Sequence, residues 1–254
     1  MTITNDTERE NLIEAGHRLA RVLEALRGKV APGVSAEALD DLAEQMIRDT
    51  GDTPAFLGYT PDGARRPYPA TLCVSINEEV VHGIPNEEPK VLKEGDIVGL
   101  DLGLVHNGII VDAAITVAVG QISEESKKLM RVTEEALVAG IVAARPGNHV
   151  GDIGHAIQEV IERAGFAVVR DLGGHGVGER VHEEPFIANF GRSGEGPELV
   201  EGQVLALEPI ASAGRGAVIL APDGYTYRTK DGSRSAHYEH TILIEQGGAL
   251  VVTK

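Results

Sequence analysis

The chain has 254 residues, of which 42% are hydrophobic and 24% are charged, values typical of a globular protein with a substantial core. Its 39 acidic and 23 basic residues give a formal net charge of -16, which argues against generic binding to nucleic acid or to anionic lipid. The sequence lacks a secretory signal and an apolar run of the roughly 18 residues that span a membrane, and its single cysteine, Cys73, cannot form an internal disulfide. We therefore expect a cytoplasmic protein.

Four helices are predicted along the chain. Thr7 and Glu10 have capping-box spacing ahead of a helical apolar pattern, which predicts a helix over about 8 to 28. Ser35 can cap a second helix that ends before Gly51. A long helix from about 123 to 144 and another from about 151 to 164 follow.

The two pairs of helices belong to an internal repeat. APGVSAEALDDLAEQMIRDTG at 31 to 51 aligns without gaps on RPGNHVGDIGHAIQEVIERAG at 145 to 165. VVHGIP at 80 to 85 then matches RVHEEP at 180 to 185, and EGDIVGLD at 94 to 101 matches EGQVLALE at 201 to 208. The conserved order of these blocks predicts two halves, about 8–122 and 123–254, that form one domain with pseudo-twofold symmetry and place a site at their seam.

Two aspartates lie inside the apolar stretch LDLGLVHNGIIVDAAITV at 100 to 117. Asn107-Gly108 predicts a tight hairpin that pairs Asp101 with Ala114 and leaves Asp112 on the same face. The backbones at Asp101 and Asp112 would then be roughly 7 to 8 Å apart, a separation suited to cations between the two carboxylates. The alternative for each aspartate alone is a strand end or a solvated face.

The second half offers matching ligands. The repeat places Glu208 where Asp101 stands, and Glu239 opens an apolar strand much as Asp112 does. His175 lies among glycines, which allow the backbone to approach a ligand closely. One histidine and four carboxylates suit two divalent ions that activate water for hydrolysis.

The remaining histidines divide into two groups. His82 and His182 are related by the repeat and lack a carboxylate neighbour for sharing a metal, so we expect them to face the substrate as donors or acid-base groups. His17, His149 and His155 fall on predicted helices or their caps and are expected to have no special role.

The chain resembles the type I methionine aminopeptidases, which belong to peptidase family M24. Prolidase and aminopeptidase P share the pita-bread fold of these enzymes. The resemblance runs from about residue 8 to the C-terminus and rests on CVSINEEVVHGIP, GLDLG with VDAAIT, GGHGVGERVHEEP, LEP and YEHTI. It implies an α+β fold in which a central curved antiparallel sheet is covered by helices on its outer face. It also implies removal of N-terminal methionine when the second residue is small.

The family pattern implies a role for each site residue. Asp112 and Glu239 would bridge two divalent ions, Asp101 would hold one ion, and His175 with Glu208 would hold the other. A hydroxide between the ions would attack the scissile carbonyl, with Glu208 as proton acceptor and the substrate amine beside the ion on Asp101. His82 would contact the amide beyond the scissile bond, and His182 would stabilise the oxyanion. Co, Mn, Fe and Zn all suit this ligand set.

An apolar pocket for the methionine side chain is also implied. The residues that match pocket positions are Tyr59, Tyr68, Cys73 and Tyr225, where Tyr68 matches only if PDGARR at 61 to 66 is an insertion. Val181 replaces an aromatic residue of relatives, which predicts a wider pocket, and Gly103 stands where some relatives have a hydroxyl residue.

The resemblance implies peptide and nascent-protein N-termini as partners of a monomer, with no membrane or direct nucleic-acid role. A transient ribosome contact would use basic residues such as Lys127, Lys128 and Arg131, for which a solvated helix face is the alternative. Two rival functions stay open. One is a peptidase acting before proline, although such relatives usually carry a further N-terminal domain, and the other is a peptide-binding module without catalysis.

Overall fold

The computed structural model describes residues 1–61 and 63–254, so Asp62 of the PDGARR segment lies outside the described residues. The helices are α1 (Asp6–Arg27), α2 (Ala36–Asp49), α3 (Glu124–Ala143) and α4 (Val150–Arg163). None of the helices in the described part of the chain combines the length and the apolar character that crossing a bilayer requires.

Side chains at the helix starts satisfy the first amide groups. The side chains of Ser35 and Ser123 accept hydrogen bonds from the backbones of Ala38 and Ser126, so the predicted starts of α2 and α3 are confirmed. The predicted start of α1 is wrong by two residues, because Asn5 rather than Thr7 caps this helix and its Oδ1 atom accepts from the Glu8 amide at 3.0 Å.

Nine strands form the central antiparallel sheet, in the order β1-β4-β5-β14-β9-β7-β8, with β2 also paired to β4 and β15 to β14. Their bounds are β1 (Thr53–Pro54), β2 (Leu72–Ile76), β4 (Ile97–His106), β5 (Ile109–Ala118), β7 (Gly173–Gly176), β8 (Glu183–Ala188), β9 (Val204–Leu207), β14 (Glu239–Glu245) and β15 (Gly248–Val251). Strands of the first half and of the second half therefore meet where β5 pairs with β14.

Two three-stranded sheets flank the central one, in the orders β13-β10-β6 and β11-β12-β3. Their bounds are β3 (Glu79–Val81), β6 (Ala167–Val168), β10 (Ile210–Ser212), β11 (Val218–Leu220), β12 (Tyr227–Thr229) and β13 (Ser235–His237).

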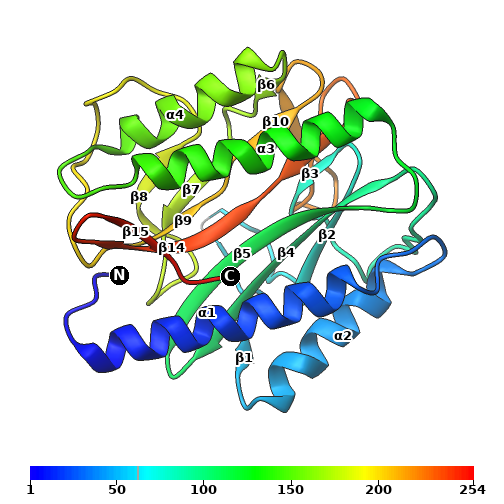
Figure 1. The fold of residues 1–254 in the computed structure, drawn as a ribbon. Helices are drawn as coiled ribbons and strands as arrows, with labels where there is room; N and C mark the ends of the chain where they lie inside the picture. Colours follow the sequence, from blue (N-terminus) through cyan, green and yellow to red (C-terminus); the bar gives the residue numbers. More distant parts are fainter. Residues whose placement is uncertain (62) are drawn as a thin grey trace.

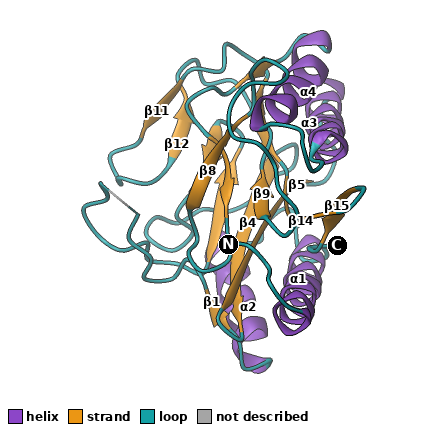
Figure 2. Ribbon diagram, turned by 90° about the vertical axis from the view of Figure 1, so that its left-hand side faces the viewer, coloured by secondary structure: helices purple, strands orange, loops and turns teal. Residues whose placement is uncertain are grey.

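The helices lie on one side of the curved central sheet, and β11 and β12 lie on the other (Figures 1 and 2). A continuous apolar core that extends from Leu12 to Val252 fills the space between helices and sheet. This arrangement confirms the predicted α+β pita-bread fold. It leaves the inner face of the sheet available for a site.

The strand register around the seam agrees with the predicted hairpin. Asn107 and Gly108 have φ values of 49° and 82°, as a tight turn between β4 and β5 requires, and Asp101 is paired with Ala114. Across the seam, Glu239 pairs with that same Ala114. The sheet thus brings the aspartate hairpin of the first half beside the strand that carries Glu239.

Two threonine hydroxyls tie the halves together in a reciprocal manner. Thr241 Oγ1 accepts from the Asp112 amide at 2.8 Å and donates to the Asp112 carbonyl at 2.7 Å. Thr116 Oγ1 makes the same two contacts with the backbone of His237, at 3.0 and 2.7 Å. The symmetry of these contacts makes His237, rather than Glu239, the structural counterpart of Asp112. The analogy expected between Asp112 and Glu239 is therefore wrong, because symmetry places Glu239 opposite Ala114.

Candidate metal centre

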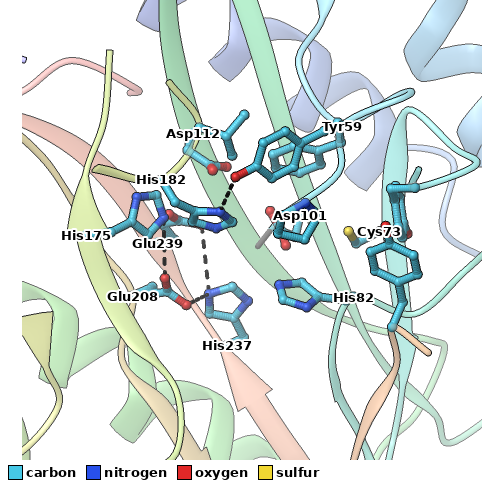
Figure 3. A pocket seen from close by; sticks show the side chains of 15 residues that line it. Tyr59, Cys73, His82, Asp101, Asp112, His175, His182, Glu208, His237 and Glu239 are labelled. Carbon is cyan, nitrogen blue, oxygen red and sulfur yellow. Dashed lines mark hydrogen bonds and ion pairs between the residues drawn. The ribbon is translucent and has the colours of Figure 1, made fainter. Parts of the chain in front are cut away.

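The five residues predicted as metal ligands lie together on the inner face of the sheet, around one pocket (Figure 3). They come from five strands or strand ends in both halves, namely Asp101 in β4, Asp112 in β5, His175 in β7, Glu208 just after β9 and Glu239 at the start of β14. The ligand atoms of Asp112, His175 and Glu239 lie within 4.8 Å of one another. The sheet therefore brings the predicted residues into one cluster.

The carboxylates of this cluster are buried without enough hydrogen-bond donors. Asp101 is 8% exposed, and Asp112 and Glu239 are each 3% exposed. One oxygen of each of these three side chains makes no hydrogen bond to any described residue. Because an unpaired buried carboxylate is costly, the site requires either protons or cations between its oxygens.

The pKa values of the acidic groups follow from this burial. Burial raises the pKa of Asp101 to about 7, despite an opposing hydrogen bond with Cys73. Burial and the neighbouring carboxylates raise the pKa of Asp112, Glu208 and Glu239 well above the usual values. Four acids that disfavour one another's charge are a strong electrostatic attractor for divalent cations.

His175 presents a single nitrogen to this cluster. Its Nδ1 atom lies 2.9 Å from the carbonyl oxygen of Gly176, so Nδ1 carries the proton and Nε2 is left with a lone pair, 3.6 Å from Oε1 of Glu208. A Cβ atom at Gly174 would lie 2.3 Å from the carbonyl oxygen of Ala206, and one at Gly176 would lie 2.3 Å from that of Glu184. The glycines beside His175 therefore allow the close backbone approach that holds this imidazole in place.

His82 and His182 line the same pocket. Burial, and the nearby His182, lower the pKa of His82 to about 4, and burial also lowers the pKa of His182, so both imidazoles are neutral at pH 7. Tyr59 Oη lies 2.9 Å from Nδ1 of His182. His82 has a φ of 58°, an uncommon conformation for a residue with a side chain and one that is enriched at functional sites.

The predicted side-chain pocket is a separate apolar cluster beside the acids. Its buried members are Phe56, Tyr68, Ala70, Cys73, Ile84, Val181 and Tyr225, with Tyr59 packed against them. The rings of Tyr68 and Tyr225 meet edge to face at 5.1 Å. Cys73 pairs in register with Asp101, so the apolar cluster borders the acidic one directly.

Sequence reasoning missed three residues that line the pocket, Phe56, Pro61 and His237. His237 is 4% exposed, and its Nε2 atom lies 3.6 Å from Oε2 of Glu208 and 3.8 Å from Oε2 of Glu239. A signal for His237 existed in its position two residues before Glu239. Phe56 follows a two-residue strand and carries no periodic signal.

The donor set suits divalent cations. Carboxylate oxygens and one imidazole nitrogen are ligands that Mn, Fe, Co and Zn accept. The oxygens of Asp101, Asp112 and Glu239 that lack a hydrogen bond carry negative charge that a cation would balance. Bound in such a site, divalent ions polarise a carbonyl and lower the pKa of water. The arrangement is therefore suited to metal-dependent hydrolysis.

Comparison with known sequences supports this interpretation. Residues 10–246 match the metallopeptidase family M24. The chain is 45% identical over 251 residues to a methionine aminopeptidase of Clostridium acetobutylicum, covering 99% of this chain and 98% of that protein. It is 44% identical over 241 residues to methionine aminopeptidase 1 of Bacillus subtilis, covering 95% of this chain and 94% of that protein.

Comparison with solved structures supports the same family assignment. The crystal structure of a methionine aminopeptidase from Thermotoga maritima superposes with a TM-score of 0.94 at 45% identity, and the match covers 100% of both chains. A Xaa-Pro dipeptidase from Bacillus anthracis shares the fold, with a TM-score of 0.77 at 24% identity, but the match covers only 62% of that longer chain.

Proposed function

Because this chain belongs to the metallopeptidase family M24, within the methionine aminopeptidases, we propose how its residues carry out the metal-dependent removal of N-terminal methionine. Its substrates are the N-termini of peptides and proteins. The observation that carries the proposal is the convergence of three buried carboxylates, the partly exposed Glu208 and His175 from both halves, with one oxygen each on Asp101, Asp112 and Glu239 left unpaired.

Two divalent cations fit this ligand set. Asp112 and Glu239, at the seam, would hold both ions, while Asp101 would add a ligand to one and His175 with Glu208 would add ligands to the other. Five side chains, four of them able to bind through two oxygens, offer more donors than one ion of this type needs. Co, Mn, Fe and Zn remain the candidate metals.

The proton transfers are assigned to this chain's own groups. Glu208, whose pKa burial raises well above its usual value, is the acceptor for the proton that attacking water loses. Neutral His182 donates a hydrogen bond to the oxygen that develops negative charge, while Tyr59 orients its ring through the contact at Nδ1. His82 contacts the amide beyond the scissile bond.

The apolar cluster provides selectivity for methionine. Tyr59, Tyr68, Cys73 and Tyr225 line an apolar pocket beside Asp101, which would take the methionine side chain. Val181 is 4% exposed within this cluster, so it forms part of the wall rather than opening the pocket to solvent. His82 and His182 also line the open cavity beside this pocket, where we expect the second residue of the substrate to lie and to be small.

The wider interactions follow from the same proposal. The chain acts as a cytoplasmic monomer on nascent-protein N-termini, as one domain with halves 8–122 and 123–254. Lys127 contacts Glu124 at 2.7 Å, Lys128 donates to the Ala164 carbonyl at 2.7 Å, and Arg131 contacts Glu135 at 2.8 Å. These contacts within and beside α3 fit a solvated helix face, the alternative to transient ribosome docking.

Release of free methionine from Met-Ala-Ser tests the function directly. We expect the chelated enzyme to be inactive, and cleavage to return with Mn or Co for Met-Ala-Ser but not for Leu-Ala-Ser or Ala-Pro-Ala. Cleavage chiefly of Ala-Pro-Ala would instead favour a proline-directed peptidase, whereas absence of cleavage with bound metal would favour a peptide-binding module.

The Asp112→Ala variant tests the two-metal assignment. This change removes a carboxylate from the seam while its backbone clamp to Thr241 stays in place, so we expect turnover to fall by at least about 1,000-fold with the fold retained. The fold is checked by circular dichroism, and wild-type turnover in this variant would contradict the assignment.

A further inference from the structure

One buried imidazole at the metal centre has no partner for its inward nitrogen. The Nε2 atom of His237 makes no hydrogen bond to any described residue, although the side chain is only 4% exposed. This atom lies 3.6 Å from Oε2 of Glu208 and 3.8 Å from Oε2 of Glu239, slightly beyond hydrogen-bond distance of both (Figure 3). A small closure of the two carboxylates would give the nitrogen the partners that a buried polar atom needs.

The position of His237 is held from the backbone. Thr116 both accepts from its amide and donates to its carbonyl, and β13 places it in register with Ile210. Thr241 makes the same pair of hydrogen bonds, to the amide and the carbonyl of Asp112. Asp112 and His237 therefore occupy equivalent positions on the two sides of the pseudo-twofold seam. The imidazole of His237 thus points into the site from a backbone whose amide and carbonyl are both held by Thr116.

Glu208 lies between two imidazoles. Oε1 is 3.6 Å from Nε2 of His175, and Oε2 is 3.6 Å from Nε2 of His237. Nδ1 of His175 is already occupied by the Gly176 carbonyl, which leaves its Nε2 as a lone-pair ligand. The group able to donate to Glu208 from the other side is therefore His237.

We propose that His237 is a positioning residue of the metal centre, whose Nε2–H is shared by Glu208 and Glu239 and orients both carboxylates toward the divalent cations. The inference rests on the proposed function, because it assumes that these two side chains bind metal. Donors of this kind behind metal-binding groups change affinity by about 10- to 100-fold.

Calorimetric titration of the metal-free protein with Mn²⁺ tests the proposal without relying on activity. His237→Phe keeps a ring but removes the donor, His237→Leu removes both, and His237→Gln restores an N–H. His240→Gln is the matched control, because this neighbouring histidine pairs with Thr253 through Nδ1, 2.9 Å from its hydroxyl, and does not line the site pocket. Asp112→Ala reports separately on whether the site binds metal at all.

We expect the Kd for Mn²⁺ to rise by about 10- to 100-fold in His237→Phe and His237→Leu, and to stay close to the wild-type value in His237→Gln and His240→Gln. Two apolar replacements are used so that failure of one to fold leaves the other. Wild-type affinity in the folded apolar variants would overturn the proposal. An equal loss of Mn²⁺ affinity in His237→Gln would also overturn the proposal, since it would indicate that the imidazole nitrogen of His237 binds the metal itself. If Asp112→Ala bound Mn²⁺ as well as the wild type, the proposed metal centre itself would fail.

Discussion

Gly103 shows how one residue of the metal-site strand shapes the neighbouring apolar pocket. It is paired with Asp112, and its carbonyl accepts from the Ala55 amide at 3.0 Å. A Cβ atom at this position would lie 2.7 Å from Cε1 of Phe56 and 2.8 Å from Cβ of Ala55. The absence of a side chain at Gly103 is therefore coupled to the placement of Phe56 in the pocket wall.

Gly103→Ser is expected to displace Phe56 and to lower the free energy of unfolding by about 1–3 kcal/mol, with a raised KM for Met-Ala-Ser. Urea unfolding and steady-state kinetics measure these effects. Gly99→Ser is the control, since it lies four residues earlier in β4 and its Cβ would meet Ser75 at an ordinary 3.7 Å. Equal effects of the two substitutions would contradict the coupling between Gly103 and Phe56.

The protonation of the metal-free acids makes metal binding dependent on pH. Burial raises the pKa of Asp101 to about 7, and burial together with the neighbouring carboxylates raises those of Asp112 and Glu239 well above their usual values, so the metal-free site tends to hold protons near neutral pH. A cation must displace these protons. We expect the apparent affinity for Mn²⁺ to increase from about pH 5 to pH 8, and calorimetry at pH 7 in buffers of different ionisation enthalpy to detect proton release. An affinity independent of pH would contradict this.

Among the secondary-structure elements, one carboxylate joins two helices to the central hairpin. Asp52, which follows α2, contacts Arg18 of α1 at 3.0 Å, Thr50 at 2.8 Å and His106 at the tip of β4 at 2.8 Å. Burial opposes its charge, but the hydrogen bonds from His106, Arg18 and Thr50 outweigh burial and hold the pKa of Asp52 below its usual value. This network fixes the far end of the strand pair that carries Asp101 and Asp112.

Asp52→Asn is expected to lower the free energy of unfolding by about 1–3 kcal/mol at pH 7, because Arg18 loses a buried anionic partner. The folded pKa of Asp52 is depressed, so its contribution is present above the unfolded pKa of about 3.9 and is lost as the pH falls through the folded value. The difference between the wild type and the variant should therefore narrow below about pH 4. Urea unfolding across pH measures this, with exposed Asp41→Asn as the control; a difference that persists at low pH would refute the role of charge.

For the molecule as a whole, the shared core and the shared site couple the two halves. The apolar cluster that begins at Leu12 in α1 continues to Val252 near the C-terminus, and it includes helix and strand residues of both halves. The metal cluster likewise takes side chains from both. Neither half buries a complete core or holds a complete ligand set without the other.

We therefore expect one cooperative unfolding transition for the metal-free protein. Mn²⁺ at about 100 times its Kd should add about 2.7 kcal/mol to the free energy of unfolding, since the unfolded chain lacks the assembled site. Calorimetric and spectroscopic unfolding should coincide, and Asp112→Ala should lose the metal increment while it keeps the single transition. Two separate transitions would show that the halves are independent domains.

Local patterns in the sequence were sufficient for much of this architecture. The apolar periodicity of four helices, the Asn107-Gly108 turn and the two-residue alternation of strands predict α1 to α4, the hairpin and the common face of Asp101 and Asp112. These features depend on interactions between near neighbours in the chain. The internal repeat extended the same reasoning to Glu208 in the second half.

Other features depend on contacts between distant segments. Asn5 caps α1 in place of the expected Thr7, and Thr2 before it pairs with Gln203. His237 faces the carboxylates because Thr116, more than a hundred residues earlier, clamps its backbone, and Phe56 reaches the pocket because Gly103 leaves space for it. The sequence by itself determines local features, namely turns, helix caps and the face of a helix or strand on which a residue lies. Which distant residues come into contact across the seam is decided by packing in three dimensions, because many chain segments compete for the same space.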